Sequence, residues 1–229
     1  SGYFAAITGM DSNIGRLIDW MEANGLRANT LIVFTADNGL NMGHHGIWGK
    51  GNGTYPPNMF DTAVKVPTLI SRPGHVPVGV VEESLLSHYD FMPTLLEYVG
   101  LSDAQPTDGD RPGRSFVPIM KGTSMGTSRP VVVLDEYGPT RMIRTESLKY
   151  VHRYPDGPYE LYDLVGDPEE TVNEIDNPTF AGPISELRGQ LERWFERYTE
   201  VERDGRNQAV KGRGQLDAVG KPDPFAQDV

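Results

Sequence analysis

The stretch Leu31-Ile32-Val33-Phe34-Thr35-Ala36-Asp37-Asn38-Gly39 is a short apolar, β-branched run that ends in a polar turn. Such a run predicts a fully buried parallel strand over residues 31–35. Upstream, apolar residues recur at helical spacing and predict an amphipathic helix: Met10, Ile14, Leu17, Ile18 and Met21. A helix, a buried strand and a polar turn make half of a βαβ unit, and ligands of α/β sheets gather at the carboxyl ends of such strands. Asp37 and Asn38 therefore stand where a site is expected.

The predicted secondary structure of the chain changes after about residue 100. A second strand is expected over residues 66–71, and a helix capped by Asp90 is expected to stop at Gly100. Further on, the runs 131–134, 141–144 and 149–151 are typical of antiparallel strands, and apolar residues from Ile184 to Tyr198 predict a helix with Pro183 in its first turn. The sequence thus indicates an α/β part followed by a small α+β part.

These patterns suggest four segments. Residues 1–101 form part of an α/β domain, and residues 102–128, rich in Asp, Pro and Gly, form a linker or surface excursion. Residues 129–202 form a small α+β subdomain. Residues 203–229 have few large apolar side chains, so we expect an extended or mobile tail.

Composition excludes several classes of function. The 229 residues carry a formal net charge of -11 and no long Lys/Arg run, so nucleic acid is an unlikely partner. No stretch approaches the ~20 apolar residues of a membrane span. Because the chain has 0 cysteines, it holds no disulfide, thiolate metal site or cysteine nucleophile.

Asp37 and Asn38 offer a carboxylate and an amide oxygen side by side. Hard oxygen donors of this kind suit Ca²⁺ or Mg²⁺ better than Zn²⁺. The alternative is an ordinary Asx turn, since Asp-Asn-Gly is a common turn sequence.

The glycine-rich loop that follows contains further candidates. His44 and His45 are flanked by glycines, and an imidazole there could donate to an oxyanion or protonate a leaving oxygen. Lys50, between Gly49 and Gly51, could bring an ammonium and backbone N–H groups to an anion. Solvent-exposed loop side chains are the plainer alternative for all three.

Order and spacing decide between these alternatives. Five segments in succession resemble the sulfatase family: Phe34 to Gly39, Gly43 to Tyr55, Met59 to Pro67, Ser87 to Leu96, and Glu160 to Asn173. The last contains Glu160-Leu161-Tyr162-Asp163-Leu164 and Asp167-Pro168-Glu169-Glu170, which are similar to the family's C-terminal signature. The resemblance covers roughly residues 1–200.

The resemblance implies the α/β, alkaline phosphatase-like fold, of which this chain would supply the second half. That half comprises part of a mostly parallel sheet flanked by helices and a small C-terminal antiparallel sheet packed by a helix. It also implies one Ca²⁺ ion held by an early Asp pair and a later Asp-Asn pair, which Asp37 and Asn38 match. Lys50 matches the lysine that contacts the sulfate, and His45 matches a histidine near the site better than His44 does.

The family's nucleophile, a formylglycine made from Cys or Ser in a C-x-P-S-R-like motif, has no counterpart in this sequence. We therefore expect a missing N-terminal part of the same protein to supply it, and the chain alone to be inactive. The expected substrate is a sulfated small molecule or saccharide, with the complete protein in the periplasm, outside the cell or in the lysosome. The alternatives are a phosphonate monoester hydrolase or phosphodiesterase of the same superfamily, and a non-catalytic binding remnant.

Overall fold

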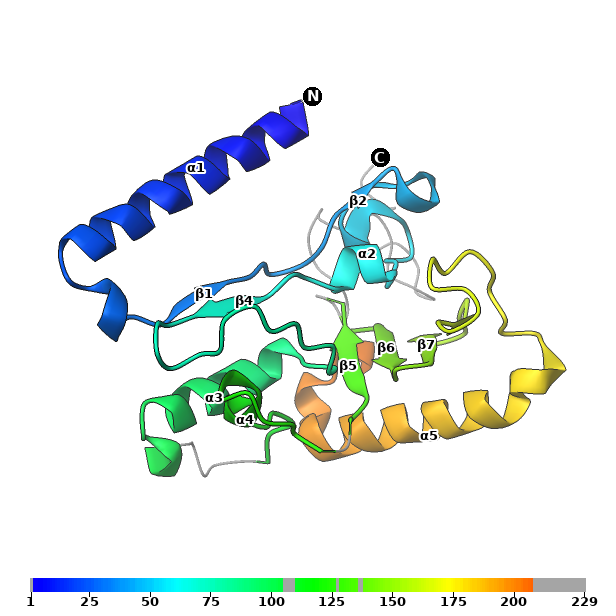
Figure 1. The fold of residues 1–229 in the computed structure, drawn as a ribbon. Coiled ribbons are helices and arrows are strands. Elements are labelled where there is room, and N and C mark those ends of the chain that lie inside the picture. The colour runs from blue at the N-terminus through cyan, green and yellow to red at the C-terminus, as the bar shows by residue number, and fades with distance from the viewer. Residues whose placement is uncertain (1, 105–109, 127, 136–137, 208–229) are drawn as a thin grey trace. The chain divides into compact units, whose positions relative to one another are not determined.

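The structure, a computed structural model, describes residues 2–104, 110–126, 128–135 and 138–207 (Figure 1). The chain forms two units that interleave along the sequence. The first comprises residues 1–36, 67–82 and 117–125, and the second comprises residues 37–66, 83–116 and 126–229. The predicted segment limits at residues 101, 128 and 202 remain predictions.

The first unit contains two helices and a two-stranded ribbon. Helix α1 (Gly2–Ala23) confirms the predicted amphipathic helix, and β1 (Ile32–Phe34) pairs with β4 (Leu69–Ser71). The short helix α4 (Val117–Met120) completes the unit. The expectation of a fully buried parallel strand at β1 is wrong within this chain. The pairing is antiparallel, with Val33 opposite Ile70, and β1 is only partly buried because no further strand of the described residues pairs with it.

Helix α1 exposes much of its apolar face. Six large apolar side chains are exposed along it: Tyr3, Phe4, Ile7, Met10, Leu17 and Trp20. Contiguous apolar surface of this kind normally packs against another protein element. No helix among the described residues combines the length and apolarity needed to cross a membrane.

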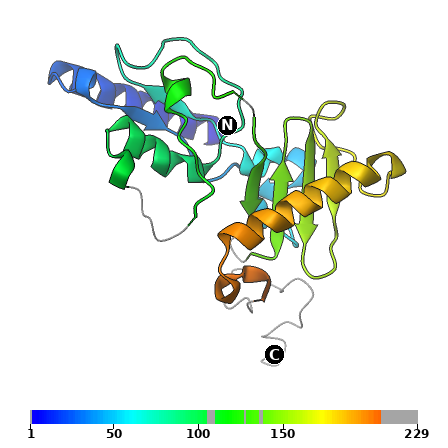
Figure 2. The same ribbon diagram turned by 90° about the horizontal axis from the view of Figure 1, so that it is seen from below.

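The second unit is built on a four-stranded antiparallel sheet. The strands β5 (Val131–Leu134), β6 (Thr140–Arg144), β7 (Leu148–Arg153) and β8 (Glu160–Asp163) are ordered as in the sequence. Figure 2 shows α5 (Ala181–Tyr198) lying across one face of this sheet. The predicted antiparallel strands and terminal helix are thus confirmed, with Pro183 in the first turn of α5.

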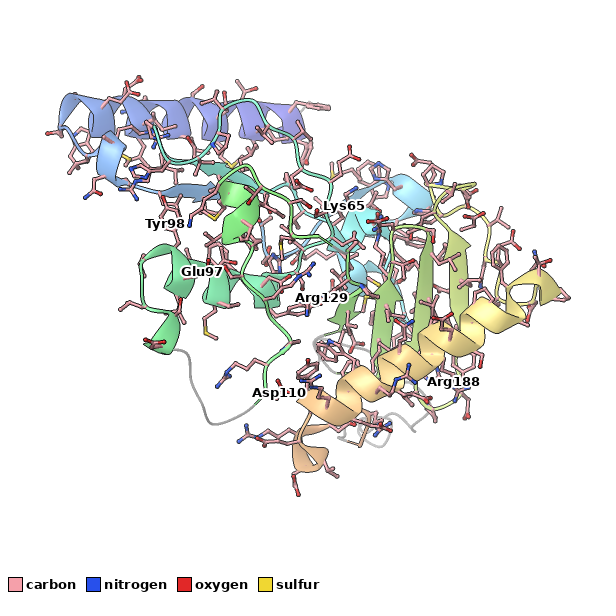
Figure 3. The ribbon with its side chains drawn as sticks, turned by 60° about the horizontal axis from the view of Figure 1, so that its bottom comes forward. Lys65, Glu97, Tyr98, Asp110, Arg129 and Arg188 are labelled. Atoms are coloured by element: carbon pink, nitrogen blue, oxygen red, sulfur yellow. The ribbon has the colours of Figure 1, made fainter. Side chains whose placement is uncertain are left out.

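The two faces of the sheet bury different partners. Toward α5, the core consists of Val132, Ile143, Tyr150, Leu161, Leu187, Leu191 and Phe195. On the other face, Met142 and Val151 pack with Met59. Met142 and Ile143 are neighbours in β6, so this division follows the period of two that strands impose on their side chains. The sheet thereby holds the segment around Met59, which leads into α2 (Asp61–Val64). Arg188 lies on the outer side of α5 (Figure 3). It pairs with Glu192 one turn later at 2.9 Å.

The remaining elements of the second unit are short. The hairpin β2 (Asn41–Met42) and β3 (Trp48–Gly49) carries the glycine-rich loop, and α3 (Phe91–Tyr98) ends before Gly100, whose φ is 77°. The prediction that Asp90 caps α3 is wrong, because its side chain makes no capping hydrogen bond to that helix. Ser87 is the N-cap of the preceding turn. The Asp90 carboxylate accepts the Ser87 N–H at 2.9 Å, which makes a capping box.

The first residues of the predicted tail bind to the sheet of the second unit. Asp204 is buried and pairs with Arg141 of β6, so residues 204–207 are held against the sheet rather than extended away from it. Residues 208–229 of the predicted tail lie outside the described residues.

The buried His152 of β7 predicts a pH-dependent stability. Burial, together with the nearby positive charge of Arg188, lowers the pKa of His152 from its usual 6.5 to about 4. The unfolded chain therefore takes up a proton first as the pH falls, and stability present above pH 6.5 is lost down to about pH 4. The expected loss is about 3 kcal/mol, because each tenfold difference in proton affinity between the folded and unfolded chain is worth ~1.4 kcal/mol.

Urea denaturation between pH 7 and pH 4 measures this loss. His152→Gln should flatten the pH dependence relative to the unmodified chain, whereas His75→Gln, at an exposed histidine, should retain it. Equal slopes for the two variants would show that His152 does not titrate as described.

Candidate functional site

Asp37 and Asn38 come shortly after β1 and are separated from it by Thr35 and Ala36. The Asp37 carboxylate is 82% exposed, and its Oδ1 accepts the Asn38 backbone N–H at 2.9 Å. The Asn38 side-chain NH₂ group donates to the Gly39 carbonyl at 2.7 Å, and its Oδ1 accepts a hydrogen bond from Lys50. The bond to the Asn38 N–H reaches one residue along the chain, whereas an Asx turn reaches two, and the Gly39 N–H donates to Ala63 instead, so the Asx-turn alternative is not what the structure shows. Asp37 Oδ2 and Asn38 Oδ1 take no part in these local bonds.

Lys50 reaches back to these two residues from the end of the β2–β3 hairpin. Its Nζ donates to Asn38 Oδ1 at 3.2 Å and lies 3.8 Å from Asp37 Oδ2. One cation thus already contacts both oxygen donors, which is the arrangement that a bound metal ion would also need. The structure brings Asp37, Asn38 and Lys50 together.

A buried asparagine pair supports the position of Lys50. Asn58 donates to the carbonyls of Lys50 and Gly51, at 3.3 and 3.0 Å. Asn41, which is fully buried, donates to the Gly49 carbonyl at 3.2 Å and accepts from Thr62. Buried amides with these partners fix the loop, because breaking them would leave polar groups unpaired. The sequence analysis did not identify either asparagine. Each is a polar residue between apolar or proline neighbours, and ordinary turns show the same pattern, so the sequence does not distinguish the two cases.

Gly39 is required by close packing. A Cβ at this position would lie 2.2 Å from the Thr62 carbonyl oxygen, and the Gly39 N–H donates to the Ala63 carbonyl at 2.8 Å. The turn that carries Asp37 and Asn38 is therefore pressed against α2.

The two histidines have different roles. His44 accepts the Met42 N–H on Nδ1 at 3.2 Å, which closes the loop locally. His45 has a left-handed backbone, with φ of 54°, and its ring stacks on Phe60 at 3.7 Å between centroids and 6° between planes. Within the described part of the chain, His45 makes no hydrogen bond or ion pair with Asp37, Asn38 or Lys50. The structure therefore groups Asp37, Asn38 and Lys50, whereas His45, the fourth predicted residue, packs on Phe60.

The donor set fits a hard cation but is incomplete. Asp37 and Asn38 supply two oxygens, and the described residues contain no group of three or more His, Cys, Asp or Glu side chains that could hold a metal. Because Ca²⁺ takes 6–8 oxygen ligands, the remaining ligands would have to come from elsewhere.

The C-terminal signature is mainly structural. Asn173 accepts the Leu161 N–H at 2.9 Å, and Glu160 pairs with Arg153 at 2.8 Å. Asp167 accepts the N–H groups of Thr171 and Val172, and the bond to Val172 is the leading cause of its lowered pKa. The bonds of Asn173 and Asp167 shape the loop after β8, whereas the Glu160–Arg153 pair joins β8 to β7.

Comparison with known proteins identifies the family. The family model described as Sulfatase matches residues 1–101. The choline-sulfatase of Rhizobium meliloti (strain 1021) is 34% identical over 191 residues, which cover 80% of this chain and 34% of that protein.

Two solved structures share the fold. BT4656 in complex with its substrate D-glucosamine-2-N,6-O-disulfate aligns with a TM-score of 0.75 and 29% identity, covering 88% of this chain and 41% of that one. The phosphonate monoester hydrolase of Agrobacterium radiobacter aligns with a TM-score of 0.68 and 28% identity, covering 85% and 40%. These likenesses confirm the predicted α/β fold class, and the chain spans less than half the length of each relative. By family match, sequence and fold, this chain belongs to the sulfatase family of the alkaline phosphatase-like superfamily.

Proposed function

We propose that the complete protein to which this chain belongs hydrolyses sulfate esters of carbohydrates with the help of Ca²⁺. The observation that carries the proposal is the contact of Lys50 with both Asn38 and Asp37 in a chain of this family. Likeness to a structure bound to a disulfated glucosamine supports a saccharide as the substrate.

The residues of this chain would act mainly by electrostatics. Asp37 and Asn38 would hold the ion, which when bound supplies positive charge to the ester oxygens. Lys50 would bind the sulfate group and stabilise the charge that builds on its oxygens. With the ion bound at Asp37 and Asn38, the Lys50 ammonium would turn from these oxygens toward the anion. His45 would donate a hydrogen bond to the ester or protonate the leaving oxygen.

The nucleophile and the remaining ligands would come from an N-terminal part of the same protein. The exposed apolar face of α1 and the partly buried strand β1 support this, because a large α/β domain would cover both. We expect the 229 residues alone to hydrolyse nothing at a useful rate. Calcium use and a saccharide substrate also favour a protein exported from the cytoplasm.

The first experiment is to sequence the reading frame upstream of Ser1. A C-x-P-S-R or S-x-P-S-R motif preceded by an Asp pair should be found there. The product of the whole frame should then hydrolyse 6-O-sulfated glucosamine, while the 229-residue chain should not. A reading frame that starts near Ser1 would instead indicate a non-catalytic remnant.

The second candidate is phosphonate monoester hydrolysis, which the alignment with the Agrobacterium radiobacter enzyme favours. Asn38 argues against it, since we expect His at this position in those relatives. Parallel assays with choline sulfate, a sulfated glucosamine and a phosphonate monoester distinguish the candidates. Faster turnover of the phosphonate would replace the proposed function.

A further inference from the structure

A buried ionic cluster joins the C-terminal signature to the segment after the glycine-rich loop. Lys149 of β7 is fully buried, and its ammonium lies 2.5 Å from Asp61 Oδ1 and also pairs with Glu170. It donates a further bond to the Met59 carbonyl at 3.0 Å. Arg144 of β6 completes the cluster, with its guanidinium 3.1 Å from Asp61 Oδ2. Three charged side chains of the C-terminal part thus converge on residues 59–61.

The Glu170 side chain also binds the backbone of residues 59–61. Its Oε2 accepts the Asp61 N–H at 2.6 Å, between residues 109 positions apart. Glu170 itself has a φ of 56°, in the left-handed region that is costly for residues with a side chain. The loop after β8 therefore places this carboxylate at Asp61 against a local backbone preference.

Phe60 lies between the two anchored residues Met59 and Asp61. Its ring stacks on His45 at 3.7 Å, and it packs on Tyr162 of β8 at 5.8 Å with a tilt of 54°. Because the backbone is fixed on both sides, the Phe60 ring has little freedom to leave the imidazole. The position of His45 is thereby linked to the cluster.

The energetics suggest that the cluster serves geometry more than stability. Burial raises the pKa of Glu170, and the charge of Lys149 opposes this rise without overcoming it. Burial also acts to raise the pKa of Asp61, but Lys149 and Arg144 lower it on balance. Removing these charges from water costs free energy. Apolar residues of equal volume in place of a buried ion pair often give a core of equal or greater stability. A cluster of this kind instead fixes one arrangement of its segments.

We propose that Glu170 and Lys149 are positioning residues that set the place of the His45 imidazole through Phe60. The role of His45 itself rests on the proposed function, whereas the linkage rests on the contacts above. The inference assigns to the C-terminal signature a part in organising the site.

Side-chain NMR of the histidines in the 229-residue chain tests the linkage. The stacked Phe60 ring should shift the His45 Cε1–Hε1 signal upfield, and His45→Gln assigns that signal by its loss. Phe60→Leu should abolish the shift, and Phe60→Tyr, which keeps a ring, should retain it. Glu170→Gln should reduce the shift, because it removes the charge paired with Lys149.

Two controls make the result specific. Glu169→Gln changes the exposed neighbour of Glu170 and should leave the His45 signal in place. The signal of buried His152 should stay unchanged in every variant, which reports that the sheet remains folded. In the double variant, Glu170→Gln should add nothing to Phe60→Leu, since both act through one ring. An unmoved His45 signal in Glu170→Gln, with a moved one in Phe60→Leu, would overturn the linkage.

Activity of the complete protein separates the linkage from the proposed function. Glu170→Gln should lower kcat/KM by about 10- to 100-fold, the scale expected when a catalytic group is misplaced by up to ~1 Å. The calcium requirement should stay the same, because Asp37 and Asn38 are untouched. If the NMR signal moves and turnover does not, the linkage stands and His45 has no part in the reaction.

Discussion

Asp37→Ala should abolish calcium-dependent turnover of the complete protein, with a loss of at least ~1,000-fold in kcat/KM. Asp37 contributes the only carboxylate of the pair at the end of β1, and without it Asn38 alone is a weak donor for Ca²⁺. A metal that stabilises transition-state charge is worth several kcal/mol, and each ~1.4 kcal/mol is tenfold in rate. Steady-state kinetics with calcium titration, and calorimetric calcium binding to the same protein, measure the effect.

Asp176→Ala is the matched control, because Asp176 is an exposed aspartate on the loop before α5. It should leave both turnover and calcium binding unchanged. Stability should not change with Asp37→Ala, since its ion pair with Lys50 is exposed on both sides and such pairs contribute little. Unchanged activity and an unchanged calcium requirement in Asp37→Ala would refute the metal assignment.

Lys50→Ala should lower kcat/KM by at least ~100-fold, roughly the cost of removing one oxyanion donor. The ammonium is the charged group that the second unit places beside Asp37 and Asn38, and Asn58 holds its backbone there. Lys50→Arg should recover part of the loss, because charge is restored while the compact shape of the ammonium is not. Sulfate ester hydrolysis at several substrate concentrations measures kcat and KM separately.

Lys65→Ala serves as the control, since Lys65 is an exposed lysine in the same unit. It should change kcat/KM by less than about twofold. A loss of only a few-fold in Lys50→Ala would make Lys50 an ordinary loop lysine. The proposed anion site would then need another cation.

Local patterns predicted a large part of this structure. The helical spacing from Met10 to Met21 indicated α1, and short β-like runs separated by turn residues indicated the strands β5 to β7. These patterns succeed because side-chain periodicity follows directly from backbone geometry. The adjacency of Asp37 and Asn38 needed no tertiary information, and the spacing of Lys50 entered through the family resemblance.

Other features depended on partners that periodicity does not reveal. A short apolar run at β1 is compatible with either pairing direction, and the return of the chain through β4 made it antiparallel. Asp90 looks like a cap when read alone, but the hydrogen bond to Ser87 shows that the cap lies three residues earlier.

The sequence by itself predicted the helices α1, α3 and α5, the strands β5 to β7 and the α/β class. With the family resemblance, it selected Asp37, Asn38 and Lys50 as site candidates. Only the tertiary structure decided that Asn58 holds Lys50, that Phe60 stacks on His45 and that Glu170 anchors Asp61 from 109 positions away. The physical reason is that periodicity and turn chemistry act over a few residues. A buried ion pair or a ring stack instead depends on the path of the whole chain, which brings distant residues to one point.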